Sequence, residues 1–105
     1  MSTSPSIFLD RAQLEKRIEK AKRKLGSEVV RANHSLGTDW SGDPAIYFRI
    51  VLTDAASQED GLVDVTLRIS TFLTDEIRPY ELGLIDYCSF RSQSENDARS
   101  DPGWT

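Results

Sequence analysis

Three aspartates around one apolar segment have the side chains best suited to metal chemistry. Asp39 and Asp43 precede the run "PAIYFRIVL", and Asp54 follows it. Carboxylate oxygens are the ligands that Mg²⁺ and Ca²⁺ prefer in proteins. The spacing of these aspartates matches no calcium-binding loop. They are therefore the candidates for a metal site, but the pattern predicts neither a bound metal nor a cofactor.

Nucleophilic chemistry has equally few candidates. His34 is the single histidine and Cys88 the single cysteine, and Ser35 follows the histidine. A catalytic nucleophile needs a base within hydrogen-bond reach, and nothing in the spacing of these residues indicates such a pair. Gly37 and Gly42 precede a strand and not a helix N-terminus, so they do not form a phosphate-binding loop of the usual kind. We expect that the protein is not an enzyme.

The stretch 37–44 has the composition of a hairpin loop. Its glycines, aspartates and serine favour tight turns, and Pro44 restricts the backbone at the start of the next strand. Trp40 is not explained by turn formation, because a large aromatic side chain is costly to expose on a loop. Two alternatives follow: Trp40 folds back over the end of the core, or it anchors a partner.

Hydrophobic periodicity indicates five elements in the order α-β-β-α-β. A first helix begins near Ser6 or Asp10 and ends at Gly26, with an apolar stripe made of Leu14, Ile18, Ala21 and Leu25. A second helix is predicted at 62–77, and strands are predicted at 28–36, 45–53 and 84–90. Two helices with one apolar stripe each are expected to cover the same sheet face. The predicted fold is an α+β two-layer sandwich with a three-stranded sheet and both helices on one side.

The predicted domain covers residues 10–91. An N-terminal extension (1–9) precedes it, and a polar, flexible tail (92–105) follows it. No apolar run reaches the length of a membrane span, and the N-terminus lacks the pattern of a signal peptide. A lone cysteine forms no intramolecular disulfide. These features favour a cytoplasmic protein.

Strand alternation predicts which side chains the uncovered sheet face presents. The first strand places Val30, Ala32, His34 and Leu36 on one face and Val29, Arg31 and Asn33 on the other. The second strand places Tyr47 and Arg49 opposite its apolar residues. The third strand leaves both assignments open: either Asp86, Cys88 and Phe90 or Ile85, Tyr87 and Arg91 face outward. In the second case the open face is aromatic and basic, which suits a protein partner or stacked single-stranded bases.

The net charge of −4 conceals a basic first helix. Residues 10–25 contain more than half of the 13 lysines and arginines of the chain. Lys16, Lys20, Arg23 and Lys24 are therefore the candidates for nucleic-acid binding. The alternative is a solvated helix face on which acidic and basic side chains pair four residues apart.

The run "SLGTDWSGDPAIYFRIVL", with the basic helix before it and "FRSQSE" after it, resembles a group of small bacterial α/β proteins. These accompany an all-helical partner of the HEPN type in modules similar to toxin–antitoxin pairs. The resemblance covers most of residues 10–95 and implies a protein partner of that kind. In comparable modules the partner of a HEPN protein resembles a minimal nucleotidyltransferase with a Gly-Ser turn and an Asp-x-Asp pair. Here Thr38 follows Gly37, and Ala45 stands two residues after Asp43, so the resemblance implies a non-catalytic binding member.

Three functional hypotheses follow. The first is a protein-interaction module, antitoxin-like or regulatory, that binds through Trp40, Arg31, Asn33, Tyr47 and Arg49. The second is an RNA- or DNA-binding domain that uses the basic helix and the open face. The third is the remnant of a metal-dependent enzyme that uses Asp39, Asp43 and Asp54. We favour the first hypothesis, and a homodimer formed through the open face or a strand edge is compatible with it.

Overall fold

The computed structural model describes residues 10–58, 60–99 and 101–104 of this 105-residue chain. The predicted N-terminal extension and the alternative helix start at Ser6 lie outside the described residues. Along the described part the elements are α1 (Arg11–Arg23), β1 (Val29–Thr38), β2 (Pro44–Leu52), α2 (Leu62–Ile77), the 3-10 turn η2 (Pro79–Leu82), β3 (Ile85–Ser92), the short helix α3 (Gln93–Asp97) and the 3-10 turn η3 (Pro102–Trp104). The larger elements confirm the predicted α-β-β-α-β order.

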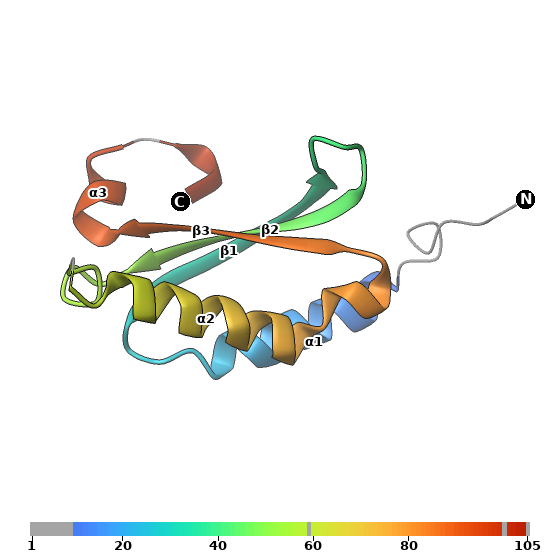
Figure 1. Ribbon diagram of the computed structural model, residues 1–105, viewed down its shortest axis with the longest axis horizontal. Helices are drawn as coiled ribbons and strands as arrows, with labels where there is room; N and C mark the ends of the chain where they lie inside the picture. The colour runs from blue at the N-terminus through green and yellow to red at the C-terminus, as the bar shows by residue number, and fades with distance from the viewer. Residues whose placement is uncertain (1–9, 59, 100, 105) are drawn as a thin grey trace, which may run out of the picture.

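The three strands form one sheet in the order β1-β2-β3. β1 and β2 pair antiparallel as a hairpin, and β3 pairs parallel with β2 after the chain has crossed over through α2. Figure 1 shows α1 and α2 packed together along one face of the sheet. The prediction of a two-layer α+β fold with both helices on one face is confirmed.

α1 begins at a capping aspartate, and α2 ends just before a proline. Asp10 caps α1, because its Oδ1 accepts a 3.0 Å hydrogen bond from the backbone N–H of Gln13. α2 occupies Leu62–Ile77, the range that its apolar periodicity predicts. It ends at Arg78, which takes the left-handed conformation with φ 50°, and Pro79 follows. Because a proline disrupts a continuing helix, the chain turns here toward β3.

The core lies between the sheet and this helix layer. The four β2 side chains predicted to share one face are all buried in it: Ile46, Phe48, Ile50 and Leu52. They pack with the buried stripes of the two helices, which are Leu14, Ile18 and Ala21 in α1 and Val65, Ile69, Leu73 and Ile77 in α2. The opposite side of the sheet, called the open face below, is covered by neither α1 nor α2.

A β-bulge between Val29 and Arg31 changes the alternation at the start of β1. Val29 pairs with Leu52 and packs against the core, whereas Val30 is 42% exposed. The prediction that Val30 shares the face of Ala32 is wrong, because the extra residue of a bulge reverses the alternation before it. From Ala32 onward the predicted alternation holds.

The register of β3 decides the question that its sequence leaves open. Cys88 and Phe90 pack against the core. Tyr87, which is in register with Tyr47, and Arg91 therefore lie on the open face. The structure thus adopts the second of the two predicted alternatives, in which the open face is aromatic and basic.

The segment after β3 returns to the open face. The sequence predicts a polar, flexible tail here; the structure places α3 and η3 on the side of the sheet away from α1 and α2, as Figure 1 shows. The side chain of Ser92 caps α3 by accepting a hydrogen bond from the backbone N–H of Glu95. η3 then lies over the middle strand, so the open face is covered over part of its length.

None of the described helices combines the length and apolar character needed to cross a membrane.

Candidate functional site

The open face gathers four of the five residues that the sequence predicts to bind a partner, and the fifth, Trp40, lies on the loop between β1 and β2. Tyr47 and Arg49 lie there on β2, and Asn33 of β1 pairs with Arg49. Arg31 follows the bulge and pairs with Val51. With the contribution of β3, the aromatic and basic side chains of this face are Tyr47, Tyr87, Arg31, Arg49 and Arg91. They divide into a tyrosine end, near the β1–β2 loop, and an arginine end, near α3.

Two tyrosines from neighbouring strands stack at the tyrosine end. The ring centroids of Tyr47 and Tyr87 are 5.4 Å apart, and their planes differ by 16°. The Tyr47 hydroxyl donates to the Thr38 carbonyl at 2.7 Å, and the Tyr87 hydroxyl donates to Asp39 Oδ2 at 3.0 Å. The bond to the Asp39 carboxylate raises the pKa of Tyr87, so this phenol remains a neutral donor. The pair connects β2 and β3 to the β1–β2 loop.

The loop itself (39–43) is a tight hairpin turn organised by Asp39. Its Oδ1 accepts hydrogen bonds from the Ser41 hydroxyl at 2.6 Å, the Ser41 N–H at 2.9 Å and the Asp43 N–H at 3.0 Å. The hydroxyl bond, with help from the backbone N–H groups and Tyr87, lowers the pKa of the Asp39 carboxyl. Gly42 takes φ 88°, a conformation that favours glycine. The composition of the loop is thus explained by turn formation.

Trp40 projects from this turn and is 94% exposed. The alternative in which Trp40 folds back over the end of the core is therefore wrong. The reason is the closure of the turn: Asp39 N–H bonds the Asp43 carbonyl, and Gly42 N–H bonds the Asp39 carbonyl, both at 2.9 Å. These bonds leave residue 40 at the tip, beyond the last paired residues of the hairpin, Thr38 and Pro44.

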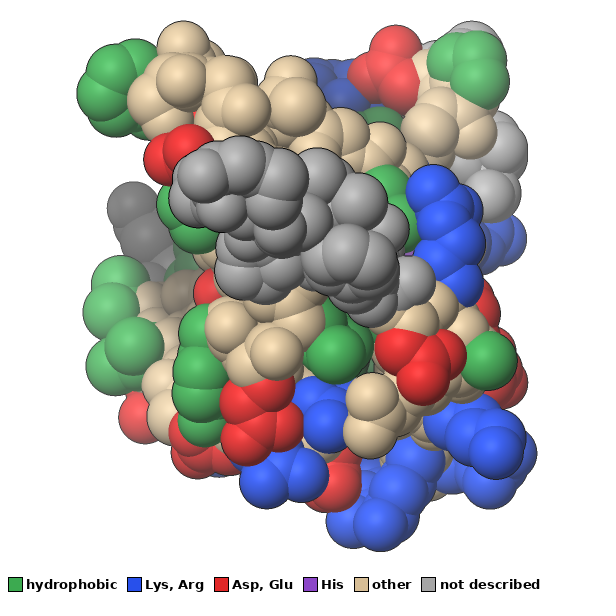
Figure 2. Space-filling model, turned by 90° about the vertical axis from the view of Figure 1, so that its right-hand side faces the viewer, with side chains coloured by type: hydrophobic (Ala, Val, Ile, Leu, Met, Phe, Trp, Pro, Cys, Tyr) green, Lys and Arg blue, Asp and Glu red, His purple; other side chains and the backbone are tan. Residues whose placement is uncertain are grey.

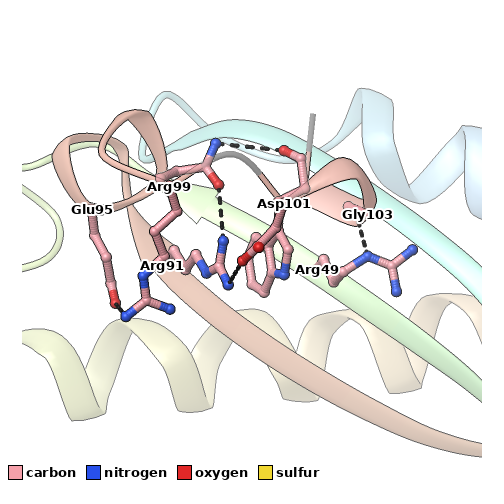
Figure 3. Close-up of polar contacts among 8 residues, drawn as sticks. Arg49, Arg91, Glu95, Arg99, Asp101 and Gly103 are labelled. Atoms are coloured by element: carbon pink, nitrogen blue, oxygen red, sulfur yellow. Dashed lines mark hydrogen bonds and ion pairs between the residues drawn. The ribbon is translucent and has the colours of Figure 1, made fainter.

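Three arginines, one from each strand, define the arginine end. Arg91 pairs with the Asp101 carboxylate at 2.6 Å, and its guanidinium carbon lies 4.2 Å from the centroid of the Trp104 ring. Arg49 Nε donates to the Gly103 carbonyl at 2.5 Å, as Figure 3 shows. Arg31 Nη1 donates to the Trp104 carbonyl at 3.2 Å. The chain's own C-terminal segment therefore occupies this end of the face.

Trp104 was not among the predicted site residues. Its signal in the sequence is an isolated aromatic residue, preceded by Pro102 and Gly103, in an otherwise polar stretch. Such a residue gains little in a solvated tail but can stack on an arginine. The pattern does not say which arginine it meets, because the contact joins residues brought together only by the fold.

The three aspartates proposed for a metal site do not meet. Asp39 and Asp43 share the hairpin turn through Ser41. Asp54 follows the far end of the nine-residue strand β2, and its Oδ1 accepts a 2.9 Å bond from the N–H of Ser94. A strand of that length separates its ends by roughly 30 Å. Within the described residues, no three His, Cys, Asp or Glu side chains are grouped so that they could hold a metal ion.

His34, Ser35 and Cys88 do not form a nucleophile–base pair either. His34 faces the helices, where its Nε2 lies 3.0 Å from Glu15 Oε1. Ser35 faces the other way and accepts a bond from Arg49 Nη1 at 3.0 Å. Cys88 lies two strands away from His34, roughly 10 Å across the sheet. Burial raises the pKa of the Cys88 thiol to about 11, so it is protonated near neutral pH.

The basic first helix keeps most of its charge at the surface. Figure 2 shows Lys and Arg side chains gathered on the helix side of the molecule. Lys16, Lys20 and Arg23 are exposed on α1. Lys24 differs, because its Nζ bonds the Glu76 carboxylate at 2.8 Å and holds the pKa of that carboxyl below its usual value. The predicted charged surface is present, and one of its four residues also ties α1 to α2.

Comparisons with protein-family models, with curated proteins and with solved structures find no match for this chain.

Proposed function

We propose that this protein is a non-catalytic interaction module, antitoxin-like or regulatory, that binds a second protein through the tyrosine end of its open face. The observation that carries the proposal is Trp40, 94% exposed at the tip of a turn that Asp39 holds in place. Tryptophan is enriched among the residues that dominate binding energy at protein interfaces. A side chain exposed to this degree gains its apolar contacts only from another molecule.

The surroundings of Trp40 support the same function. The stacked Tyr47 and Tyr87 lie next to the loop, and Ile85, two residues before Tyr87 on the same face, is 42% exposed. Aromatic and apolar side chains of this kind form the centre of protein interfaces. Because the loop is already organised by hydrogen bonds, it would lose little conformational entropy when a partner binds.

The test is co-expression with the product of the adjacent gene, which the resemblance implies to be an all-helical protein, followed by size-exclusion chromatography with light scattering. We expect a stable complex that Trp40→Ala weakens by at least about thirtyfold, as loss of a central aromatic residue does. The matched control is Leu67→Ala, an apolar residue of α2 that is 65% exposed. Failure to form a complex would overturn the proposal. A complex that both substitutions weaken equally would show that Trp40 is not at the centre of the interface.

A second candidate function, nucleic-acid binding, is favoured by the exposed row of Lys16, Lys20 and Arg23 on α1. Contacts between such side chains and phosphates release counterions, so binding would weaken steeply with salt. Fluorescence anisotropy with a labelled single-stranded RNA at two salt concentrations tests it. Salt-sensitive binding that Lys16→Glu/Lys20→Glu abolishes would support this function, and binding unaffected by the charge reversal would exclude it for α1.

A further inference from the structure

The arginine end of the open face holds a peptide segment in a manner that resembles ligand binding. Residues 101–104 contribute one carboxylate, two backbone carbonyls and one indole ring. The carboxylate of Asp101 and the ring of Trp104 both contact Arg91. The carbonyls of Gly103 and Trp104 accept bonds from Arg49 and Arg31. Each strand supplies one of these arginines, and Asn96 Nδ2 of α3 adds a longer bond of 3.5 Å to the Trp104 carbonyl.

Arginine is suited to this task because its planar guanidinium offers several donors in a fixed geometry and also stacks on aromatic rings. The three arginines come from neighbouring strands of one sheet. Arg49 is positioned in addition by the Ser35 hydroxyl, which accepts from its Nη1 at 3.0 Å. The side chain of Arg91 is only 11% exposed. The backbone of the site thus belongs to the sheet, and Arg49 is fixed there independently of the occupant, which is a short turn.

The occupant is attached to the sheet by contacts that water or another peptide can replace. The Asp101 side chain is 53% exposed, and no residue of η3 is buried. Gly103 lies close over Arg49: a Cβ added there would be 3.4 Å from Arg49 Nε. The glycine leaves room for the backbone carbonyl to reach the guanidinium, because even a Cβ at this position would already be in van der Waals contact with the Arg49 side chain.

We propose that the arginine end is a docking site for a short peptide segment of a second protein, with an acidic residue three positions before a tryptophan or similar aromatic residue. The chain's own residues 101–104 fill the site until such a segment displaces them. This inference rests on the proposed function, since it names the part of the partner that the face receives. Charge complementarity supports it: three arginines face one carboxylate and two carbonyl oxygens.

A peptide is favoured over a nucleic acid by what the arginines contact. Two of the three bind backbone carbonyls, which every peptide segment carries, and the indole ring supplies the remaining specificity. The protein as a whole has a net charge of −4, which opposes the approach of a polyanion.

The occupant is tethered to the site and therefore has a high effective concentration there, so it competes strongly with any ligand in solution.

The probe for the test is a fluorescein-labelled, C-terminally amidated peptide with the sequence of residues 98–105, ARSDPGWT. Its binding is measured by fluorescence anisotropy against the full chain and against a release variant, Asp101→Ala/Trp104→Ala, checked for folding by circular dichroism. We expect the release variant to bind at least about tenfold more tightly than the original chain, because its site is vacant for a larger fraction of the time. We expect Gly103→Leu to act as a second release variant that keeps both anchor residues, because its side chain extends beyond a Cβ that already contacts Arg49.

Substitutions within the release variant then define the site. Arg91→Ala should weaken peptide binding by at least about tenfold, since it removes both an ion pair and a ring contact. Arg99→Ala is the matched control, because Arg99 pairs with Glu95 at 3.1 Å and is 53% exposed. Trp40→Ala should also leave binding unchanged, since it lies at the other end of the face. Equal loss in all three variants would overturn the assignment to the arginine end.

Three other results would overturn the inference. Equal affinity of the original chain and both release variants would show that residues 101–104 do not compete for the site. Dimerisation of the original chain that both release variants abolish would make the occupant a second copy. Binding of a labelled single-stranded oligonucleotide by the release variant, without peptide binding, would make the ligand a nucleic acid. If one of these results is obtained but the Trp40-dependent complex still forms, the inference fails and the proposed function stands. If the peptide binds but no Trp40-dependent complex forms, the proposed function fails and the peptide site at the arginine end stands.

Discussion

The two faces of strand β2 are covered by different means, one by the helix layer and the other, over part of its length, by the segment after β3. On one face Ile50 and Leu52 have no exposed surface and pack against two helices. On the other face Arg49 binds a carbonyl of a short turn through a hydrogen bond. Apolar burial is non-directional and extends over the whole helix layer, whereas each polar contact contributes little and exchanges readily with water. One face of β2 therefore maintains the fold, whereas the partial cover of the other face can be exchanged.

The largest expected effect concerns the helix-covered face. Ile50→Ala removes buried methyl groups from the centre of the sheet and should reduce the free energy of unfolding by about 2–5 kcal/mol. Urea unfolding followed by circular dichroism measures this. Leu67→Ala, on the exposed side of α2, should change the stability by no more than about 0.5 kcal/mol. Similar losses in both variants would contradict the assignment of the core.

A smaller effect is expected at the arginine end. Arg91→Ala removes the ion pair with Asp101 and the contact with the Trp104 ring, and should cost about 1 kcal/mol of stability. The C-terminal segment should detach while the helix layer remains folded. In a Trp40→Phe background, the fluorescence of Trp104 should shift toward the spectrum of exposed tryptophan. An unchanged spectrum would show that Arg91 does not hold the segment.

The smallest effect is expected at the hairpin turn and depends on pH. Hydrogen bonds lower the pKa of Asp39 in the folded protein below its ordinary value. A lowered pKa means that the carboxylate stabilises the fold above its unfolded pKa, near 3.9, and that this contribution disappears as the pH falls through the folded value. The amide NMR signals of Ser41 and Asp43 should therefore change only below about pH 4.

Asp39→Asn provides the control for this titration. The amide side chain cannot ionise, so the acid transition of the Ser41 and Asp43 signals should be lost. A transition that persists in the variant would belong to another carboxyl group, and the role of Asp39 in ordering the turn would need to be revised.

The helix-covered face could be predicted largely from the sequence because its determinants are local and periodic. The alternation of Ile46 to Leu52 identifies the buried face of β2, and the apolar stripe of α2 predicts its range. Each pattern arises within a single element and needs no knowledge of its neighbours. The bulge at Val29 to Arg31 escaped prediction because it is a property of the pairing between two strands.

The open face could be predicted only in part. Alternation placed Arg31, Tyr47 and Arg49 on it, but the cover of its arginine end has no comparable pattern. Backbone carbonyls such as that of Gly103 are present at every residue, so a sequence does not reveal which of them an arginine will bind. The exposure of Trp40 also depended on the closure of its turn, which composition favours without fixing the direction of the side chain.

The parallel pairing of β2 with β3 has a consequence for the route by which the chain folds. The hairpin partners Thr38 and Pro44 lie close together in the sequence, whereas the partners Ala45 and Ile85 lie on opposite sides of α2. Closing the longer connection costs more chain entropy, so the hairpin can form early and β3 must join a sheet that already exists. We expect β3 to be the first strand to lose amide protection under mild denaturant, with β1 and β2 following together; native-state hydrogen exchange would show the opposite order if the parallel pair were the folding nucleus.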